Sequence, residues 1–349
     1  MSQVAALTPR ERIARLFHRQ PMDRMPFFSG QGMVTLPAIQ SLGLRFPQIH
    51  LSAEAMAAAA TATVERYGFD AAVVPYDMCT VPEALGLRAS FYEDASDVLY
   101  PTIPAKWGSP EEVTVPPDIL ERGRLPVVSQ AIGLLREGPG ADRAIGTWLL
   151  GPFTLAGQLV ELDVLLKLTM KDRPRVERLL DRLTELIIHI GRAYQGMGVD
   201  YISLREMGTG ADILSPRVFR ELVQPYLRRI LDSWQPPRVL HICGATDPIV
   251  DYLQECGAEA LSVDHKNDLA ESRRRVGDST LLFGNLDVYR LLGQATVAEV
   301  GSKVRESAAA GADAVWPGCD IWPELKEENL FALAEAVKGL PFVAERGAH

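Results

Sequence analysis

A histidine and two cysteines follow the ends of two short apolar segments of this sequence. His241 and Cys243 lie two residues apart at the end of segment 239–242, and Cys319 lies 76 positions further on, after segment 314–316. Residues two apart in an extended strand point to the same face. One imidazole and two thiolates, with one exchangeable position, are the ligands of a catalytic zinc ion. A lone His-x-Cys pair is more often a buried histidine beside an apolar thiol, but the second strand-end cysteine favours the metal.

The charge of such a site indicates its chemistry. Asp264 ends the apolar segment 260–263, and its carboxylate is placed to fill the fourth position at rest. Zinc with two thiolates, a neutral imidazole and a carboxylate carries a net negative charge, so it is a weak Lewis acid. Zinc coordination deprotonates a substrate thiol at neutral pH, and electron-rich ligands leave that thiolate nucleophilic. Activation of a thiol therefore fits better than activation of water for hydrolysis.

Alternating segments of the chain supply the elements that must position these residues. Short apolar runs alternate with longer stretches of helical spacing, which is typical of βα units and a parallel sheet. The eight predicted strands are residues 25–28, 71–75, 144–149, 200–204, 239–242, 260–263, 281–284 and 314–316. Eight units predict an α/β fold, a (β/α)8 TIM barrel, whose strand ends form the active face. A doubly wound sheet is the rival, but neither a Gly-x-Gly-x-x-Gly motif nor a phosphate-binding loop supports it.

Helices are expected between the strands. The predicted helices are residues 8–19, which begin with Thr8-Pro9, 174–197, 215–234, and a last one from Glu324 onward. The Pro- and Gly-rich stretch 101–140 is predicted to be an elaborated loop that covers one end of the barrel. We expect one domain, residues 1–349.

Composition excludes several classes of protein. The 349 residues are 47% hydrophobic and 23% charged, which is ordinary for a globular protein. A net charge of −9 argues against a nucleic-acid or anionic-membrane surface, and every long apolar stretch is interrupted before it could span a membrane. Four cysteines are too few for a disulfide scaffold, and the first residues lack the order of a secretory leader. These features predict a cytoplasmic protein with small-molecule or protein partners.

Several stretches together resemble one family. His241-x-Cys243 with Cys319 resembles the zinc motif of corrinoid-dependent methyltransferases related to methylcobamide:coenzyme M methyltransferase, within the uroporphyrinogen decarboxylase superfamily. The stretches 10–26, 151–154, 214–216 and 225–226 resemble other parts of these proteins, so the resemblance covers nearly the whole chain. It implies a TIM barrel in which zinc activates an acceptor, such as a thiol, for methyl transfer. It also implies that Asp264 stands where a family member has a displaceable glutamate ligand.

The methylated corrinoid (cobalamin) is expected on a separate corrinoid protein, because this chain lacks the Asp-x-His-x-x-Gly motif that ligates cobalt. In the expected reaction the thiol displaces Asp264 and attacks the cobalt-bound methyl group. A donor-side demethylase, which takes methyl from an ether, amine or halide and loads Co(I), is the alternative. Glu206 and Glu221 have fourteen residues between them, and nineteen residues separate Glu221 from His241, which nearly matches the Glu-x14-Glu-x20-His zinc motif of O-demethylating relatives. Glu206 would then help to bind zinc, whereas Glu221 is otherwise expected on an exposed helix face.

Uroporphyrinogen decarboxylase and a non-catalytic zinc-binding barrel are weaker alternatives. Asp77 stands where the decarboxylases keep a catalytic aspartate, but residues 27–32, where their arginine motif would fall, contain no arginine. Asp77 is therefore predicted to line the site or to cap a turn. The resemblance implies that Glu83 and Tyr76 face the corrinoid, although an acid at a helix start explains Glu83 equally well.

The remaining reactive or charged residues carry less information. Arg205 is either a clamp for an anionic acceptor or a salt-bridge partner. Cys256 is expected to be a small buried residue, and Cys79 lies near the presumed mouth without a paired ligand. The basic run 273–275 is expected on a solvated helix face, with docking of a corrinoid protein as a lesser alternative.

Overall fold

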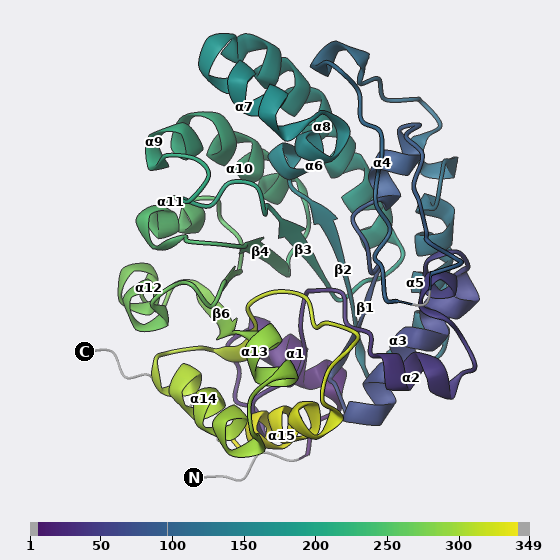
Figure 1. The fold of residues 1–349 in the computed structure, drawn as a ribbon. Coiled ribbons are helices and arrows are strands. Elements are labelled where there is room, and N and C mark those ends of the chain that lie inside the picture. Colours follow the sequence, from purple (N-terminus) through teal and green to yellow (C-terminus); the bar gives the residue numbers. More distant parts are fainter. Residues whose placement is uncertain (1–5, 96, 341–349) are drawn as a thin grey trace.

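Seven parallel strands curl around an apolar core in the computed structural model, which describes residues 6–95 and 97–340 (Figure 1). The strands pair in chain order, each with the next. They are β1 (Ala71–Val74), β2 (Ala144–Leu150), β3 (Tyr201–Arg205), β4 (Arg238–Ile242), β5 (Ala260–Val263), β6 (Leu281–Leu286) and β7 (Ala314–Pro317). The predicted TIM-barrel class is confirmed, with these seven strands at seven of the eight predicted positions. The prediction about a leader falls partly on residues 1–5, outside the described residues.

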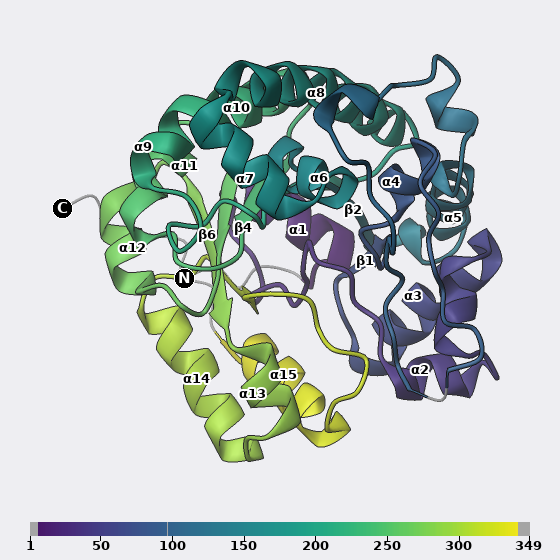
Figure 2. The ribbon, with the colours of Figure 1, turned by 45° about the horizontal axis from the view of Figure 1, so that its top comes forward.

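Helices surround the strands, as Figure 2 shows. The α-helices are α1 (Pro9–Phe17), α2 (Leu36–Ser41), α3 (Ala53–Tyr67), α4 (Thr80–Ala84), α5 (Leu125–Glu137), α6 (Pro152–Leu159), α7 (Leu162–Lys171), α8 (Arg173–Gly196), α9 (Pro216–Val218), α10 (Gln224–Ser233), α11 (Val250–Gln254), α12 (Leu269–Val276), α13 (Val288–Gly293), α14 (Val297–Ala309) and α15 (Glu327–Lys338). Shorter 3-10 turns are η1 (Phe46–His50), η2 (Pro110–Glu112), η3 (Ile119–Glu121), η4 (Pro139–Ala141) and η6 (Asp247–Ile249). Among the described helices, none is long and apolar enough to cross a membrane.

The predicted helices are present, with small shifts in their bounds. The Thr8 side chain accepts a hydrogen bond from the Glu11 backbone and completes a capping box at the start of α1. The predicted helix 215–234 begins at the Ser215 cap and contains a π-helical turn, η5 (Phe219–Val223), before α10. Pro225 has no backbone N–H to continue the α-helical ladder, which accounts for the change of register. The last helix begins at Glu327, three residues later than Glu324.

The predicted first strand, residues 25–28, is wrong, because this segment forms no ladder. Pro26 lacks an N–H, and the Phe27 N–H donates to the Asp70 carboxylate at 2.7 Å instead of to a neighbouring strand. The segment still lies against the barrel, since the Asp70 N–H donates to the Phe27 carbonyl. The following residues lie beside the last strand, where Met33 forms an isolated bridge with Ile321. Irregular chain therefore occupies the place expected for an eighth strand.

The stretch 101–140 was predicted to be an elaborated loop, and this prediction is wrong for its second half, because α5 begins at Leu125. The buried residues of α5 include Val128, Ala131, Ile132 and Leu135, which have the spacing of one helix face. Pro126 at the first turn favours a helix start. The density of prolines and glycines before residue 125 concealed this apolar stripe.

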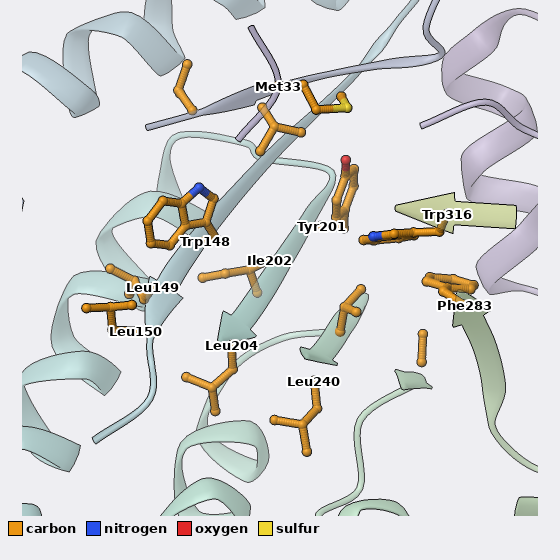
Figure 3. Packing of buried hydrophobic residues seen from close by; sticks show 14 of the residues in the cluster. Met33, Trp148, Leu149, Leu150, Tyr201, Ile202, Leu204, Leu240, Phe283 and Trp316 are labelled. Atoms are coloured by element: carbon orange, nitrogen blue, oxygen red, sulfur yellow. The ribbon is translucent and has the colours of Figure 1, made fainter. Parts of the chain in front are cut away.

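Aromatic side chains fill the barrel. Phe283 on β6 and Trp316 on β7 stack with ring centroids 4.7 Å apart (Figure 3). Phe28, from the segment that replaces the eighth strand, meets Trp316 edge-on at 4.9 Å. Trp148 on β2 lies apart from this pair and donates its indole N–H to the Pro75 carbonyl. This packing fixes the strands whose carboxyl ends carry the polar residues described next.

Candidate active site

Strands β4 and β7 bring His241, Cys243 and Cys319 to one end of the barrel. His241 lies on β4, and Cys243 follows directly after it, so both side chains share a face. The His241 Nε2 atom lies 3.1 Å from the Cys243 Sγ atom. The Cys243 Sγ atom lies 3.9 Å from the Cys319 Sγ atom, across 76 residues of sequence. His241 is buried and both cysteines are half-buried, so the thiols are the accessible part of the cluster.

Burial and charge set the protonation of this cluster. Burial, reinforced by the nearby Arg205 cation, lowers the pKa of His241 to about 3, so the imidazole is neutral. The hydrogen bond between the two thiols raises the pKa of Cys243 and lowers the pKa of Cys319. Of the two thiols, Cys319 is therefore the more readily ionised. A neutral imidazole beside an easily formed thiolate is the state that a soft metal ion requires.

The donor set fits zinc by its chemistry and by two of its distances. Tetrahedral zinc with bonds of about 2.3 Å to sulfur and about 2.0 Å to nitrogen separates two sulfurs by about 3.8 Å and a sulfur from a nitrogen by about 3.5 Å. The distances between Cys243 and Cys319 and between His241 and Cys243 lie within a few tenths of an ångström of these values. Within residues 6–95 and 97–340, no group of three or more His, Cys, Asp or Glu side chains forms a ready-made metal site. Zinc is therefore a proposal that rests on the donors.

Asp264 lies at the end of β5, beside this cluster. Its Oδ2 atom accepts the Gly244 N–H at 3.1 Å, one residue after Cys243. Its Oδ1 atom accepts the Lys266 N–H at 3.0 Å and lies 2.9 Å from His265 Nδ1. Each oxygen accepts a backbone N–H, one of them from the residue after Cys243, so the carboxylate is anchored to two neighbouring loops. A role as the fourth ligand stays a prediction.

Glu206 points away from the cluster, although it follows Arg205 at the end of β3. Its carboxylate is buried against the start of α6, where it accepts the Phe153 N–H at 3.0 Å and the Thr154 N–H at 2.6 Å. Burial raises the pKa of Glu206 to about 7, against the hydrogen bonds from Thr154 and Phe153. This carboxyl group therefore takes up its proton near neutrality.

Glu221 lies on the outside of the barrel. Its carboxylate accepts a 2.8 Å hydrogen bond from Arg173, and nearly half of its side chain is exposed. Glu206 and Glu221 therefore do not meet at His241. The near-match to the Glu-x14-Glu-x20-His motif has no counterpart in this geometry, and the exposed helix position that we considered for Glu221 is the observed one.

Asp77, after β1, belongs to a separate buried cluster. Its carboxylate accepts two hydrogen bonds from Arg124, at 2.8 and 3.0 Å, and lies 2.7 Å from His50 Nδ1. Although burial opposes ionisation, the hydrogen bonds from His50 and Arg124 hold the pKa of Asp77 well below its ordinary value. Arg124 also donates to Glu83 at 2.6 Å. Asp77 and Glu83 are thus joined through one arginine, and the Cys79 N–H, which donates to Asp77 Oδ1, matches the predicted turn cap.

The other residues considered from the sequence are engaged within the chain. The buried Tyr76 hydroxyl donates to the Met56 carbonyl at 2.7 Å. Burial raises the pKa of both Cys79 and Cys256 to about 12, so neither is a reactive thiolate. The basic run on α12 is paired: Arg273 with Asp313, Arg274 with Glu271, and Arg275 with Asp251.

Sequence reasoning missed Ser262, whose Oγ atom lies 2.9 Å from His241 Nδ1. Ser262 is the ladder partner of His241 between β4 and β5. A donating Nδ1–H fixes the imidazole with the lone pair of Nε2 toward the sulfur atoms. The signal was the parallel register of the two predicted strands, which places Ser262 beside His241.

The fold and the site together define the class: a TIM-barrel-like enzyme with an imidazole–thiol cluster at its strand ends. A model of the uroporphyrinogen decarboxylase (URO-D) family matches residues 8–340. The chain belongs to this family, so the predicted membership is confirmed.

Relatives of nearly equal length narrow the enzyme class. A methylcobamide:CoM methyltransferase, MtaA, from Methanosarcina barkeri is 30% identical over 339 residues, 95% of this chain and 98% of its own. A methylated-thiol–coenzyme M methyltransferase from Methanosarcina mazei is 28% identical and is covered to 91% of its length. The solved structure of a methyltransferase from Methanosarcina mazei superposes with a TM-score of 0.89 at 30% identity, covering 95% of this chain and 98% of its own. The predicted class of enzyme, a methyltransferase, is confirmed.

Proposed function

We propose that this protein transfers a methyl group between a methylated corrinoid and a thiol held at His241, Cys243 and Cys319. The convergence of these three side chains from β4 and β7 carries the proposal. The printed names of its relatives, methylcobamide:CoM methyltransferases, support the corrinoid as one substrate and a thiol as the other. The chain would act in the cytoplasm, in keeping with its free cysteines, and would receive the corrinoid on a separate protein.

The three side chains would hold zinc, which when bound lowers the pKa of a substrate thiol and leaves it nucleophilic. The chain contributes orientation and charge. Ser262 orients His241, and burial keeps the imidazole neutral. Asp264, anchored to the Gly244 N–H beside Cys243, would be the carboxylate that yields its place to the acceptor. The substrate sulfur attacks the methyl carbon, the cobalt–carbon bond breaks, and its electron pair stays with cobalt as Co(I).

Decarboxylation fits the geometry less well. Both oxygens of Asp77 already accept hydrogen bonds from Arg124, and Cys79 and His50 also contact this carboxylate. A carboxylate so fully engaged is poorly placed to bind a substrate. A purely structural metal is also disfavoured, because three protein donors would leave one position of a tetrahedral zinc ion for a substrate, whereas structural zinc sites use four.

The direction of transfer is the second question, since one relative is named a methylated-thiol–coenzyme M methyltransferase and so also acts on methylated thiols. The purified protein would be mixed with methylcobalamin and a thiol, or with Co(I) cobalamin and a methylated thiol, ether, amine or halide. Visible absorption follows the cobalt state in both mixtures. Faster loss of methylcobalamin with thiol supports the acceptor-side function. Faster methylation of Co(I) identifies the donor-side function, and no reaction in either mixture contradicts methyl transfer.

A further inference from the structure

Asn267, in the loop after β5, is a buried residue whose side-chain amide is fully used in hydrogen bonds. Its Nδ2 atom donates to the Gly244 carbonyl at 2.9 Å and to the Asp264 carbonyl at 3.0 Å. Its Oδ1 atom accepts the Thr246 N–H, and it also accepts the Asp247 N–H at 3.0 Å. An asparagine amide has two N–H donors and an oxygen with two lone pairs. All four positions are therefore occupied by backbone groups of the chain.

Three of these four hydrogen bonds join two loops, which we call the Cys243 loop (residues 243–247) and the Asp264 loop (residues 264–268). The fourth bond, to the Asp264 carbonyl, lies within the Asp264 loop. Gly244 is held at both of its backbone groups, because its N–H donates to the Asp264 carboxylate at 3.1 Å. Cys243 directly precedes Gly244. The Asp264 loop therefore fixes the backbone next to one of the two thiols.

The Asp264 loop also contacts the backbone that carries the other thiol, Cys319. Gly318, the residue before Cys319, lies so close that a Cβ atom added to it would be 2.8 Å from the His265 nitrogen. Asn285 on β6 holds the same loop, because its Nδ2 atom donates to the Asn267 carbonyl at 2.9 Å. One short loop thus lies against both backbones that carry the sulfur atoms. The side chain of Asn267 ties this loop to the Cys243 loop.

We propose that Asn267 is a positioning residue, which holds the Cys243 thiol at its distance from the Cys319 thiol and so prepares the site for a metal ion. The inference rests on the metal-binding role proposed above for this cluster. The two sulfur atoms lie 3.9 Å apart, close to the separation of about 3.8 Å that tetrahedral zinc requires. Thiols already held at this distance need not be ordered when the metal binds, which raises the affinity. Without the Asn267 amide, the Gly244 carbonyl and two N–H groups of the Cys243 loop lose their partner, and the loop is less firmly held.

The first test compares Asn267→Asp with a matched variant, Asn329→Asp. Aspartate has nearly the size of asparagine and keeps the oxygen acceptors, but its carboxylate has no N–H donor. Asn329 on the outer helix α15 is also buried, and its Nδ2 atom donates to the Leu291 and Ala295 carbonyls at 2.8 Å each. Urea unfolding should show a similar loss of stability in both variants.

Metal binding should distinguish the two variants. Competition with a chromogenic chelator should show that Asn267→Asp binds zinc about 10- to 100-fold more weakly than wild type does, whereas Asn329→Asp binds it equally well. The visible bands of bound Co²⁺, which report the number and geometry of the sulfur ligands, should change in Asn267→Asp alone. Unchanged zinc affinity and an unchanged Co²⁺ spectrum in Asn267→Asp would overturn the proposal, because a merely structural asparagine would behave like Asn329.

A trivalent arsenical separates this inference from the proposed function, because it bridges two neighbouring thiols without a metal ion. Phenylarsine oxide forms two As–S bonds with a pair of thiols and releases one water molecule. Mass spectrometry of the metal-free protein should show one arsenical on Cys243 and Cys319 of wild type and of Asn329→Asp, and several-fold weaker capture by Asn267→Asp. Asn267→Ala, whose smaller side chain leaves room for water, replaces Asn267→Asp if that variant does not fold.

The two measurements together assign each failure. If wild type binds no zinc but Asn267→Asp still captures the arsenical more weakly, the positioning role is supported and the metal-dependent function is contradicted. If wild type binds zinc, and Asn267→Asp equals it in zinc affinity and in arsenical capture, the positioning role alone is overturned.

Discussion

Two polar clusters lie at the strand ends of this barrel, and they differ in how completely their atoms are paired. After β1, Asp77 receives hydrogen bonds from Arg124 and the Cys79 N–H and contacts His50, and Arg124 also binds Glu83. After β4 and β7, the Cys243 sulfur contacts the Cys319 sulfur and His241, and the Asp320 backbone also forms a hydrogen bond with the Cys319 sulfur. In the first cluster the carboxylate of Asp77 and the guanidinium of Arg124 are paired within the chain, although the buried His50 Nε2 atom has no partner. The thiols of the second cluster are partly exposed, so we assign stability to the first cluster and chemistry to the second.

Replacing Cys319 tests the thiol cluster and should have the largest effect. Cys319→Ala removes one of three proposed zinc ligands, so metal content should fall to near zero. The methyl-transfer rate should fall by more than the roughly 100-fold that loss of an outer hydrogen bond costs a metal site. Metal analysis and the methylcobalamin assay measure the two effects. Cys256→Ala, a buried cysteine away from the strand ends, is the control and should keep its zinc. A zinc-free Cys319→Ala variant with full activity would contradict the assignment of methyl-transfer chemistry to the thiol cluster.

Replacing Arg124 tests the Asp77 cluster. Arg124→Met leaves the buried Asp77 without its main partner, and breaking a buried ion pair in this way costs about 3–5 kcal/mol. Urea unfolding should show this loss while zinc content per folded molecule stays the same. The control Arg122→Met removes an exposed arginine paired with Asp118 and should change stability by less than about 0.5 kcal/mol. If Arg124→Met instead kept its stability and lost zinc, the assignment of stability to the Asp77 cluster would be wrong.

The locations of both clusters could be predicted from the sequence, but their pairing could not. The βα alternation places His241, Cys243 and Cys319 at strand ends, because parallel strands share the orientation of their carboxyl ends. The partner of Asp77 is Arg124, 47 residues away in a stretch predicted to be a loop. No periodicity within either segment indicates that contact.

For the buried acid Glu206, too, the sequence predicts the location but not the hydrogen-bond partners. Glu206 follows a strand, as a ligand should, yet it turns to the backbone amides at the start of α6. Successive side chains point to opposite faces only within a strand. Glu206 lies beyond the end of β3, so the sequence does not indicate whether its carboxyl group faces the metal or the start of a helix. The missing eighth strand has a similar cause, since the N–H of Phe27 is taken by the side chain of Asp70.

Glu206 gives a test by pH. Its pKa of about 7 lies above the ordinary glutamate value of 4.5, so between these two pH values the folded state keeps a proton that the unfolded state has released. The protonated Glu206 adds up to about 3 kcal/mol to the free energy of unfolding. This contribution is full below about pH 4.5 and is lost as the pH rises to 7. Glu206→Gln should remove this slope, which urea unfolding at pH 5 and pH 7.5 would measure. A variant whose deficit grows with pH would show that the amides of α6 hold a carboxylate, and not a carboxylic acid.

Ser262 provides the finest comparison between the clusters, because its side chain contacts His241 Nδ1 from the neighbouring strand β5. Ser262→Ala removes the acceptor at Nδ1 and frees the imidazole to rotate or change tautomer. Second hydrogen bonds of this kind are worth about 10- to 100-fold in metal affinity. Competition with a chromogenic chelator should show zinc binding weakened by that factor, with stability changed far less than in Arg124→Met. Ser307→Ala, a buried serine on the outer helix α14, should leave zinc affinity unchanged. Equal affinities in Ser262→Ala and wild type would mean that His241 does not bind the metal through Nε2, and the thiol cluster would then be reduced to its two cysteines.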